Sequence, residues 1–84
     1  MPQDIQSTIE QLIPIFRDVF DDEDLMIAQN TSAQDVDGWD SLAQIRLVVS
    51  IERVLGIRFS AGEIADLKNV GEMAQLILKK QINI

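Results

Sequence analysis

Apolar residues recur at helical spacing along most of this 84-residue chain. The repeat i, i+3, i+4 predicts three amphipathic helices, over about residues 3–20, 41–55 and 70–80. A shorter helix is expected over Ala61–Asp66, because Ser60 and Glu63 have the spacing of a capping box. Asn69 and Glu72 repeat that spacing ahead of the last helix. No sustained alternation of apolar and polar residues competes with this interpretation, so the pattern predicts an all-α four-helix bundle with a short third helix.

The segment after the first predicted helix is acidic and long. Residues 21–24 are Asp-Asp-Glu-Asp, and the apolar rhythm resumes only after Asp40. Long loops are often functional, and this one is expected to contain a short helical turn. Its acidic start is a solvated corner, a weak cation site or a contact for basic side chains of a partner. Three apolar residues of the loop are expected to fold back onto the core: Leu25, Ile27 and Val36.

Inside the first helix, Pro14 removes the backbone bond to Glu10, which predicts a kink or a broken turn.

The predicted helix 41–55 is the most apolar of the four. Its apolar positions form a broad arc: Leu42, Ile45, Leu47, Val48, Val49, Ile51, Val54 and Leu55. We therefore expect this helix to be the central element, buried on most sides and ended by Gly56 in the left-handed conformation. The exposed strip is expected to be small and basic, formed by Ala43, Arg46, Ser50 and Arg53.

Length and composition restrict the chemistry available to the chain. At 84 residues and 46% hydrophobic content, we expect a single domain over residues 1–84 with one small core. The sequence has no His and no Cys, which excludes a Ser-His or Cys-His nucleophilic pair and a zinc site built on imidazole or thiolate. A chemically used serine would need activation by another protein, so we expect no enzyme activity, no catalytic residue and no metal site in the chain itself.

The net charge of −7 makes nucleic acid an unfavourable partner, because phosphate backbones attract Lys and Arg. Basic protein surfaces are expected partners, unless the charge only keeps a small protein in solution. The apolar runs are too short to span a membrane, and no secretory signal pattern opens the chain. A chain without Cys is compatible with the cytoplasm. We expect a cytoplasmic monomer that does not insert into membranes.

The run Gly38-Trp39-Asp40-Ser41-Leu42 lies where the long loop becomes a helix. Ser41 falls at or beside the helix N-cap, where unpaired backbone N–H groups and the helix dipole favour a phosphate. The simpler interpretation is a serine that only caps the helix. Trp39 is the sole Trp; it is expected to cover the edge of the core, or to shape the surface near a group attached to Ser41.

An acidic loop before a helix also suggests calcium. Aligning Gly38 with the glycine of an EF-hand places Asp35 and Asp37 at ligand positions. The same alignment places Ala33 and Gln44 where Asp and a bidentate Glu are required. Two essential ligands are therefore missing.

The layout and the motif together resemble the acyl carrier protein family, over essentially the whole chain. Members are small acidic four-helix proteins that carry 4′-phosphopantetheine on the serine of an Asp-Ser-Leu motif opening the second helix. Asp40-Ser41-Leu42 matches that motif, and Leu55-Gly56-Ile57 resembles the end of the family's second helix. The resemblance implies that a separate phosphopantetheinyl transferase moves the arm from coenzyme A to Ser41, with Asp40 helping to present the site. The thiol of the arm would then hold cargo as a thioester.

The expected exposed face of helix 41–55 differs from the family pattern. Carriers of fatty-acid synthesis typically bear an acidic face there, whereas this chain has Arg46 and Arg53, and Ala43 at a position where an acid is common. We expect Arg46, Val49 and Arg53 to contact partners. The difference favours a specialised stand-alone carrier that serves acyl- or aminoacyl-loading and transferring enzymes in lipid or secondary-metabolite biosynthesis.

Two alternatives remain at the level of the sequence. The chain could be an unmodified helical adaptor that binds a protein partner through helix 41–55 and the acidic loop, or a calcium-responsive module. A further question concerns four apolar residues that either line a pocket for an acyl chain or simply form the core: Leu47, Val48, Ile51 and Ile64.

Overall fold

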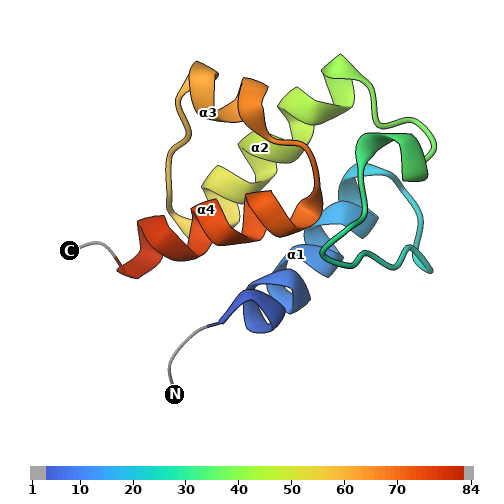
Figure 1. Ribbon diagram of the computed structural model, residues 1–84. Coiled ribbons are helices and arrows are strands. Elements are labelled where there is room, and N and C mark those ends of the chain that lie inside the picture. The colour runs from blue at the N-terminus through green and yellow to red at the C-terminus, as the bar shows by residue number, and fades with distance from the viewer. Residues whose placement is uncertain (1–3, 83–84) are drawn as a thin grey trace.

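The computed structural model describes residues 4–82, which form four α-helices, one 3₁₀ turn and no strand (Figure 1). The elements are α1 (Ile5–Val19), η1 (Ala33–Asp35), α2 (Ser41–Leu55), α3 (Ala61–Asp66) and α4 (Val70–Ile82). The predicted all-α fold and the predicted bounds of α2 and α3 are confirmed. Helix α4 continues beyond the predicted end at Lys80, and the predicted start of the first helix at Gln3 lies outside the described residues.

Helix α1 is continuous through Pro14, so the broken turn expected there is absent. Proline removes only one backbone bond, and its ring here lies on the exposed side of the helix. On the opposite side, Leu12 and Phe16 are fully buried and hold the two halves of α1 against the same core. Tertiary packing therefore outweighs the local cost of the proline.

Helix α1 is the central element of the fold, since it packs against both α2 and α4 (Figure 1). The buried core is drawn from these three helices: Ile9, Leu12, Ile15 and Phe16 of α1, Leu47 and Ile51 of α2, and Val70, Met73, Ala74 and Ile77 of α4. From the long loop, Ile27 and Val36 are buried and Leu25 packs against the core, as predicted. Within residues 4–82 no helix combines the length and the apolar character needed to cross a bilayer.

The expectation that α2 is central and buried on most sides is wrong. Only Leu47, Val48 and Ile51 of this helix are buried. Four large apolar side chains of α2 are exposed: Leu42 (60%), Ile45 (58%), Val49 (46%) and Val54 (64%). The apolar arc of the sequence is real, but only part of it faces this chain, because α2 lies on a flank of the bundle and packs mainly against α1. The exposed strip is consequently broad and largely apolar, with two arginines in it.

The long loop is fixed to the beginning of α4 through backbone hydrogen bonds. The N–H groups of Val70 and Gly71 donate to the carbonyl oxygens of Thr31 and Gln29, both at 2.8 Å. These are first-turn donors, which have no partner within their own helix. The loop therefore caps α4, and the expected helical turn follows at η1.

Candidate functional site

The residue that caps α2 is Asp40. Its Oδ1 accepts a hydrogen bond from the backbone N–H of Ala43 at 2.9 Å, and its carbonyl oxygen accepts from the N–H of Gln44 at 2.9 Å. Ser41 is the first residue inside the helix. Its position beside the N-cap was predicted, but the simpler interpretation of a capping serine is wrong.

The Ser41 hydroxyl is exposed and has no hydrogen-bond partner within residues 4–82. The hydroxyls of Ser32 and Ser60, by contrast, contact Asp35 and the Glu63 N–H in the caps of η1 and α3. The backbone N–H groups of Ser41 and Leu42 likewise have no acceptor in the described chain. The free hydroxyl thus lies beside free donors and the positive end of the α2 dipole, a favourable place for a phosphate.

Trp39 lies two residues before Ser41, and the interpretation that it covers the edge of the core is confirmed, while its effect on a group attached to Ser41 stays a prediction. Its ring packs edge-on against Phe16 with the centroids 5.4 Å apart, so it covers the edge of the core. Its Nε1–H donates to Oε1 of Gln44 at 2.6 Å, which links the turn to the second turn of α2. Just before it, Gly38 has a φ of 85°, a conformation that favours glycine.

An open groove of about 520 Å³ begins at Ser41 and runs between α2, α3 and the start of α4. Its lining is mixed, with apolar side chains from Trp39, Ile45, Ile64, Leu67 and Met73 and polar ones from Asp40, Gln44, Lys68 and Asn69. Of the four apolar residues considered for an acyl pocket, only Ile64 lines this groove. Leu47, Val48 and Ile51 are buried in the interior.

Most of the polar rim of the groove was not identified from the sequence. Gln44 and Lys68 belong to α2 and to the α3–α4 connection, and no motif indicates a place in a groove for them. Asn69 was predicted only as a cap of α4, and its Oδ1 does accept the Glu72 N–H at 2.8 Å. Their convergence depends on how α3 lies over α2 and α4 (Figure 1). Only the capping signal at Ser60 and Glu63 indicated that a short helix would stand there.

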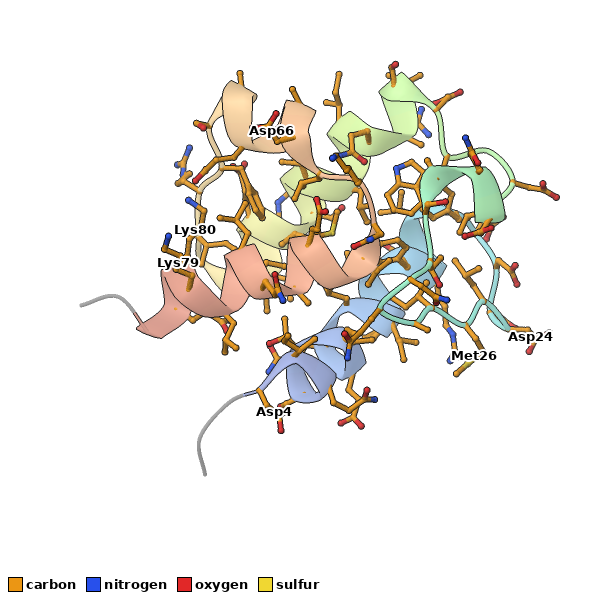
Figure 2. All side chains as sticks on the ribbon, in the orientation of Figure 1. Asp4, Asp24, Met26, Asp66, Lys79 and Lys80 are labelled. Carbon is orange, nitrogen blue, oxygen red and sulfur yellow. The ribbon has the colours of Figure 1, made fainter. Side chains whose placement is uncertain are left out.

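Helix α3, one wall of the groove, is held in place by an ion pair to α4. Glu63 accepts a hydrogen bond from the Ser60 N–H at 2.8 Å, and its carboxylate lies 3.0 Å from Nζ of Lys80. The Ser60 N–H first, and then the Lys80 ammonium, lower the pKa of Glu63 below its ordinary value. Figure 2 shows Lys80 near the C-terminal end of α4.

The residues expected to contact partners, Arg46, Val49 and Arg53, are exposed on α2. Arg46 and Val49 border a shallow hollow between α2 and the end of α1, which Asp18 also lines. The structure brings these side chains onto one surface, separate from the groove lining.

The described residues contain no set of donors that would support the calcium hypothesis. No group of three or more acidic side chains in residues 4–82 is arranged to hold a metal ion. Gln44, at the position where a bidentate Glu would be needed, accepts the Trp39 indole N–H. The acidic residues 21–24 lie along the exposed loop, where Figure 2 shows Asp24 at its outer edge.

Comparisons with known proteins agree with this geometry. The family model described as "Phosphopantetheine attachment site" matches residues 10–77. The chain is also similar to a holo acyl carrier protein from Geobacter metallireducens, solved by solution NMR: the sequences are 49% identical, the match covers 88% of this chain and 85% of that one, and the TM-score is 0.84. A comparison with curated proteins gave no match.

The family match and the holo relative support a phosphopantetheine prosthetic group and a carrier role, in which the chain is not itself catalytic. The fold, the motif position and these matches lead to one assignment: the chain belongs to the acyl carrier protein family.

Proposed function

We propose that Ser41 is the attachment point of the 4′-phosphopantetheine arm and that the chain carries acyl or aminoacyl groups between enzymes. The observation that carries this proposal is the state of the Ser41 hydroxyl, which is exposed and unbonded at the start of α2. It stands in the Asp40-Ser41-Leu42 motif of a chain whose family attaches this group. When bound, the arm supplies a thiol that holds cargo as a thioester, which a chain without Cys cannot provide itself.

The residues around Ser41 fit an attached phosphate but not self-activation. The N–H groups of Ser41 and Leu42 are free to donate to phosphate oxygens. The one adjacent carboxylate, that of Asp40, is engaged by the Ala43 N–H, and the chain has no His. A transferase would therefore remove the Ser41 proton. The serine oxygen would bond to the phosphorus next to the pantetheine of coenzyme A, the P–O bond of the diphosphate would break, and adenosine 3′,5′-bisphosphate would leave with the bridging oxygen.

We propose that the groove beside Ser41 receives the part of the arm next to Ser41, together with the cargo that the arm carries. Its polar rim at Gln44 and Asn69 offers hydrogen-bond partners, while Ile64 and Met73 offer apolar contact. Such a division, with apolar walls and a few placed polar groups, is typical of small-molecule sites.

The partners are proposed to be a phosphopantetheinyl transferase and acyl- or aminoacyl-loading and transferring enzymes of a specialised lipid or secondary-metabolite pathway. The arginines of α2, which differ from the acidic face expected for a fatty-acid carrier, support this choice. The chain is proposed to act as a monomer in the cytoplasm, with which a sequence free of Cys is compatible.

The test is to incubate the chain with coenzyme A, Mg²⁺ and a promiscuous phosphopantetheinyl transferase, and to measure its intact mass. We expect the mass to rise by one phosphopantetheine group. Ser41→Ala should abolish the rise, whereas Ser50→Ala, on the same helix but away from the groove, should leave it unchanged. A folded chain that gains no mass with an active transferase would contradict the proposal and favour the unmodified adaptor.

A further inference from the structure

The exposed side of α2 carries an apolar patch that no part of residues 4–82 covers. Among the side chains that the structure describes, five large apolar ones are strongly exposed; four belong to α2 and the other is Met26. Leu42, Ile45 and Val49 are spaced i, i+3, i+7, so they lie along one face, beginning next to Ser41. We call these three residues the α2 ridge. Exposed contiguous apolar surface of this kind marks interaction sites.

Two arginines lie beside the α2 ridge without a partner. Arg46 and Arg53 are exposed on either side of Val49 in the helical repeat, and neither forms an ion pair within residues 4–82. Asp18 borders the same hollow as Arg46 but lies beyond ion-pair distance. The spacing of seven residues separates the arginines by about 10 Å along the helix.

The only acid of α2 does not offset these charges at the surface. Glu52 accepts a hydrogen bond from the backbone N–H of Phe59 at 2.8 Å, which ties it to the segment after the helix. It is half-buried, whereas Arg53 beside it in the sequence is exposed. The surface of α2 around the ridge is therefore apolar and positively charged.

The rest of the molecule makes this positive surface unusual. Residues 1–40 contain ten of the fourteen carboxylates and only one of the seven basic side chains, Arg17. Residues 41–84 contain six basic and four acidic side chains. An acidic partner surface is thus attracted to α2 and repelled by the first helix and the long loop, which orients the encounter. Two copies that met through α2 would present Arg46 and Arg53 to one another, and each copy has a net charge of −7, so a symmetric dimer through this surface is disfavoured.

We propose that the α2 ridge docks into an apolar depression on a partner enzyme that presents carboxylates to Arg46 and Arg53. This inference rests on the proposed function, because the partner must handle cargo held at Ser41. Burial of the ridge supplies affinity, and the charge pairs supply orientation and selection of the partner. A basic docking surface, by the same argument, is rejected by repulsion from the two arginines.

The experiment uses the holo chain, with its arm confirmed by mass, and the acyl-loading activity fractionated from the native host. Loading is followed as conversion of the holo mass to the acyl mass, at substrate concentrations that give kcat/KM. Arg46→Glu with Arg53→Glu should lower kcat/KM by about tenfold or more. Arg46→Lys with Arg53→Lys should recover most of it. The matched control is Arg58→Glu with Lys79→Glu, which makes the same change in net charge at exposed positions outside α2; it should retain near wild-type loading.

The outcomes separate this inference from the proposed function. If the arm attaches normally and the Arg46/Arg53 reversal loads as fast as wild type, the docking proposal is wrong and the carrier role stands. If the control pair loses as much activity as the reversal, net charge rather than α2 decides recognition, and the proposal is again wrong. A wild-type dimer in sedimentation that the reversal dissociates would assign the ridge to a second copy. If no arm attaches to wild type, the proposed function fails and this inference fails with it.

Discussion

The Asp40 carboxylate caps the helix that Ser41 begins: Asp40 Oδ1 accepts the N–H of Ala43 at 2.9 Å, and the neighbouring Ser41 hydroxyl remains free. The two residues divide the tasks of a helix start. Asp40 satisfies the backbone, so that Ser41 does not have to. This gives a physical reason for the adjacent Asp and Ser, one that needs no catalytic role for the carboxylate.

Replacing Asp40 tests this division. Asp40→Ala should lower the free energy of unfolding by about 1 kcal/mol, as is typical for loss of an N-cap, and should slow arm attachment because the first turn of α2 frays. Asp40→Asn, which can still cap, should keep most of the stability. Asp37→Ala removes a nearby exposed acid with no hydrogen bond in the described chain and serves as the control. Urea unfolding and the rate of mass gain measure the two effects. Equal stability of Asp40→Ala and wild type would contradict the cap.

The contact between Gly71 and Gln29 predicts a strongly unfavourable substitution. A Cβ added at Gly71 would lie 2.8 Å from the Gln29 carbonyl oxygen, which itself accepts the Gly71 N–H. Gly71→Ala should therefore destabilise the fold by about 1–3 kcal/mol, as overpacking against backbone does. Gly62→Ala in α3 meets open space and should be neutral or stabilising by up to about 1 kcal/mol. If urea unfolding gave the two variants the same stability, the loop would not be held against α4 as described.

Trp39 is a built-in reporter of the groove. It is the only Trp in a chain without Tyr, and its ring lines the groove. Attaching an apolar acyl group to the arm should shift its fluorescence emission to shorter wavelength, because cargo in the groove displaces water from the indole. Ile64→Asp, which makes the lining polar, should reduce the shift without preventing arm attachment. Identical emission from the holo and acylated chains would place the cargo outside the groove.

The Glu63–Lys80 ion pair predicts a pH dependence of stability. The pKa of Glu63 is lowered in the folded state by the Ser60 N–H and by Lys80. The stabilisation is therefore present above the unfolded-state pKa and is lost as the pH falls through the folded-state pKa. Glu63→Gln should be less stable than wild type near neutral pH, and the difference should narrow on acidification.

Asp66→Asn removes a carboxylate from the same helix and has no contact with Lys80 among the described interactions (Figure 2). It should cost less than Glu63→Gln near neutral pH. A stability difference between Glu63→Gln and wild type that stayed constant from neutral to acidic pH would argue against the ion pair. Thermal unfolding across that range measures both variants.

Local signals in the sequence were sufficient to predict most of the helices of the fold. Gly56 ends α2 in the left-handed conformation, and the box of Ser60 and Glu63 begins α3, both as predicted. These features depend on residues close together in the chain. The broken turn considered at Pro14 does not occur, because Leu12 and Phe16 are buried by other helices, while the kink stays a prediction.

The site was only partly predictable for the same reason. The motif identified Ser41 as the candidate attachment residue, but which apolar residues of α2 face the core and which face outward depends on where α1 lies. Ile45 and Val49 follow the same helical repeat as Val48, yet only Val48 is buried. Periodicity shows that a helix has an apolar face; it does not show whether the chain itself or a partner covers it.

Fragment-ion mass spectrometry of the chain purified from its native host shows directly which serine carries the arm. We expect a phosphopantetheine group on Ser41, with the acyl or aminoacyl cargo still bound in a fraction of the molecules. Ser7, Ser32, Ser50 and Ser60 should be unmodified. An unmodified Ser41, or an arm on any of those four serines, would rule out Ser41 as the attachment point.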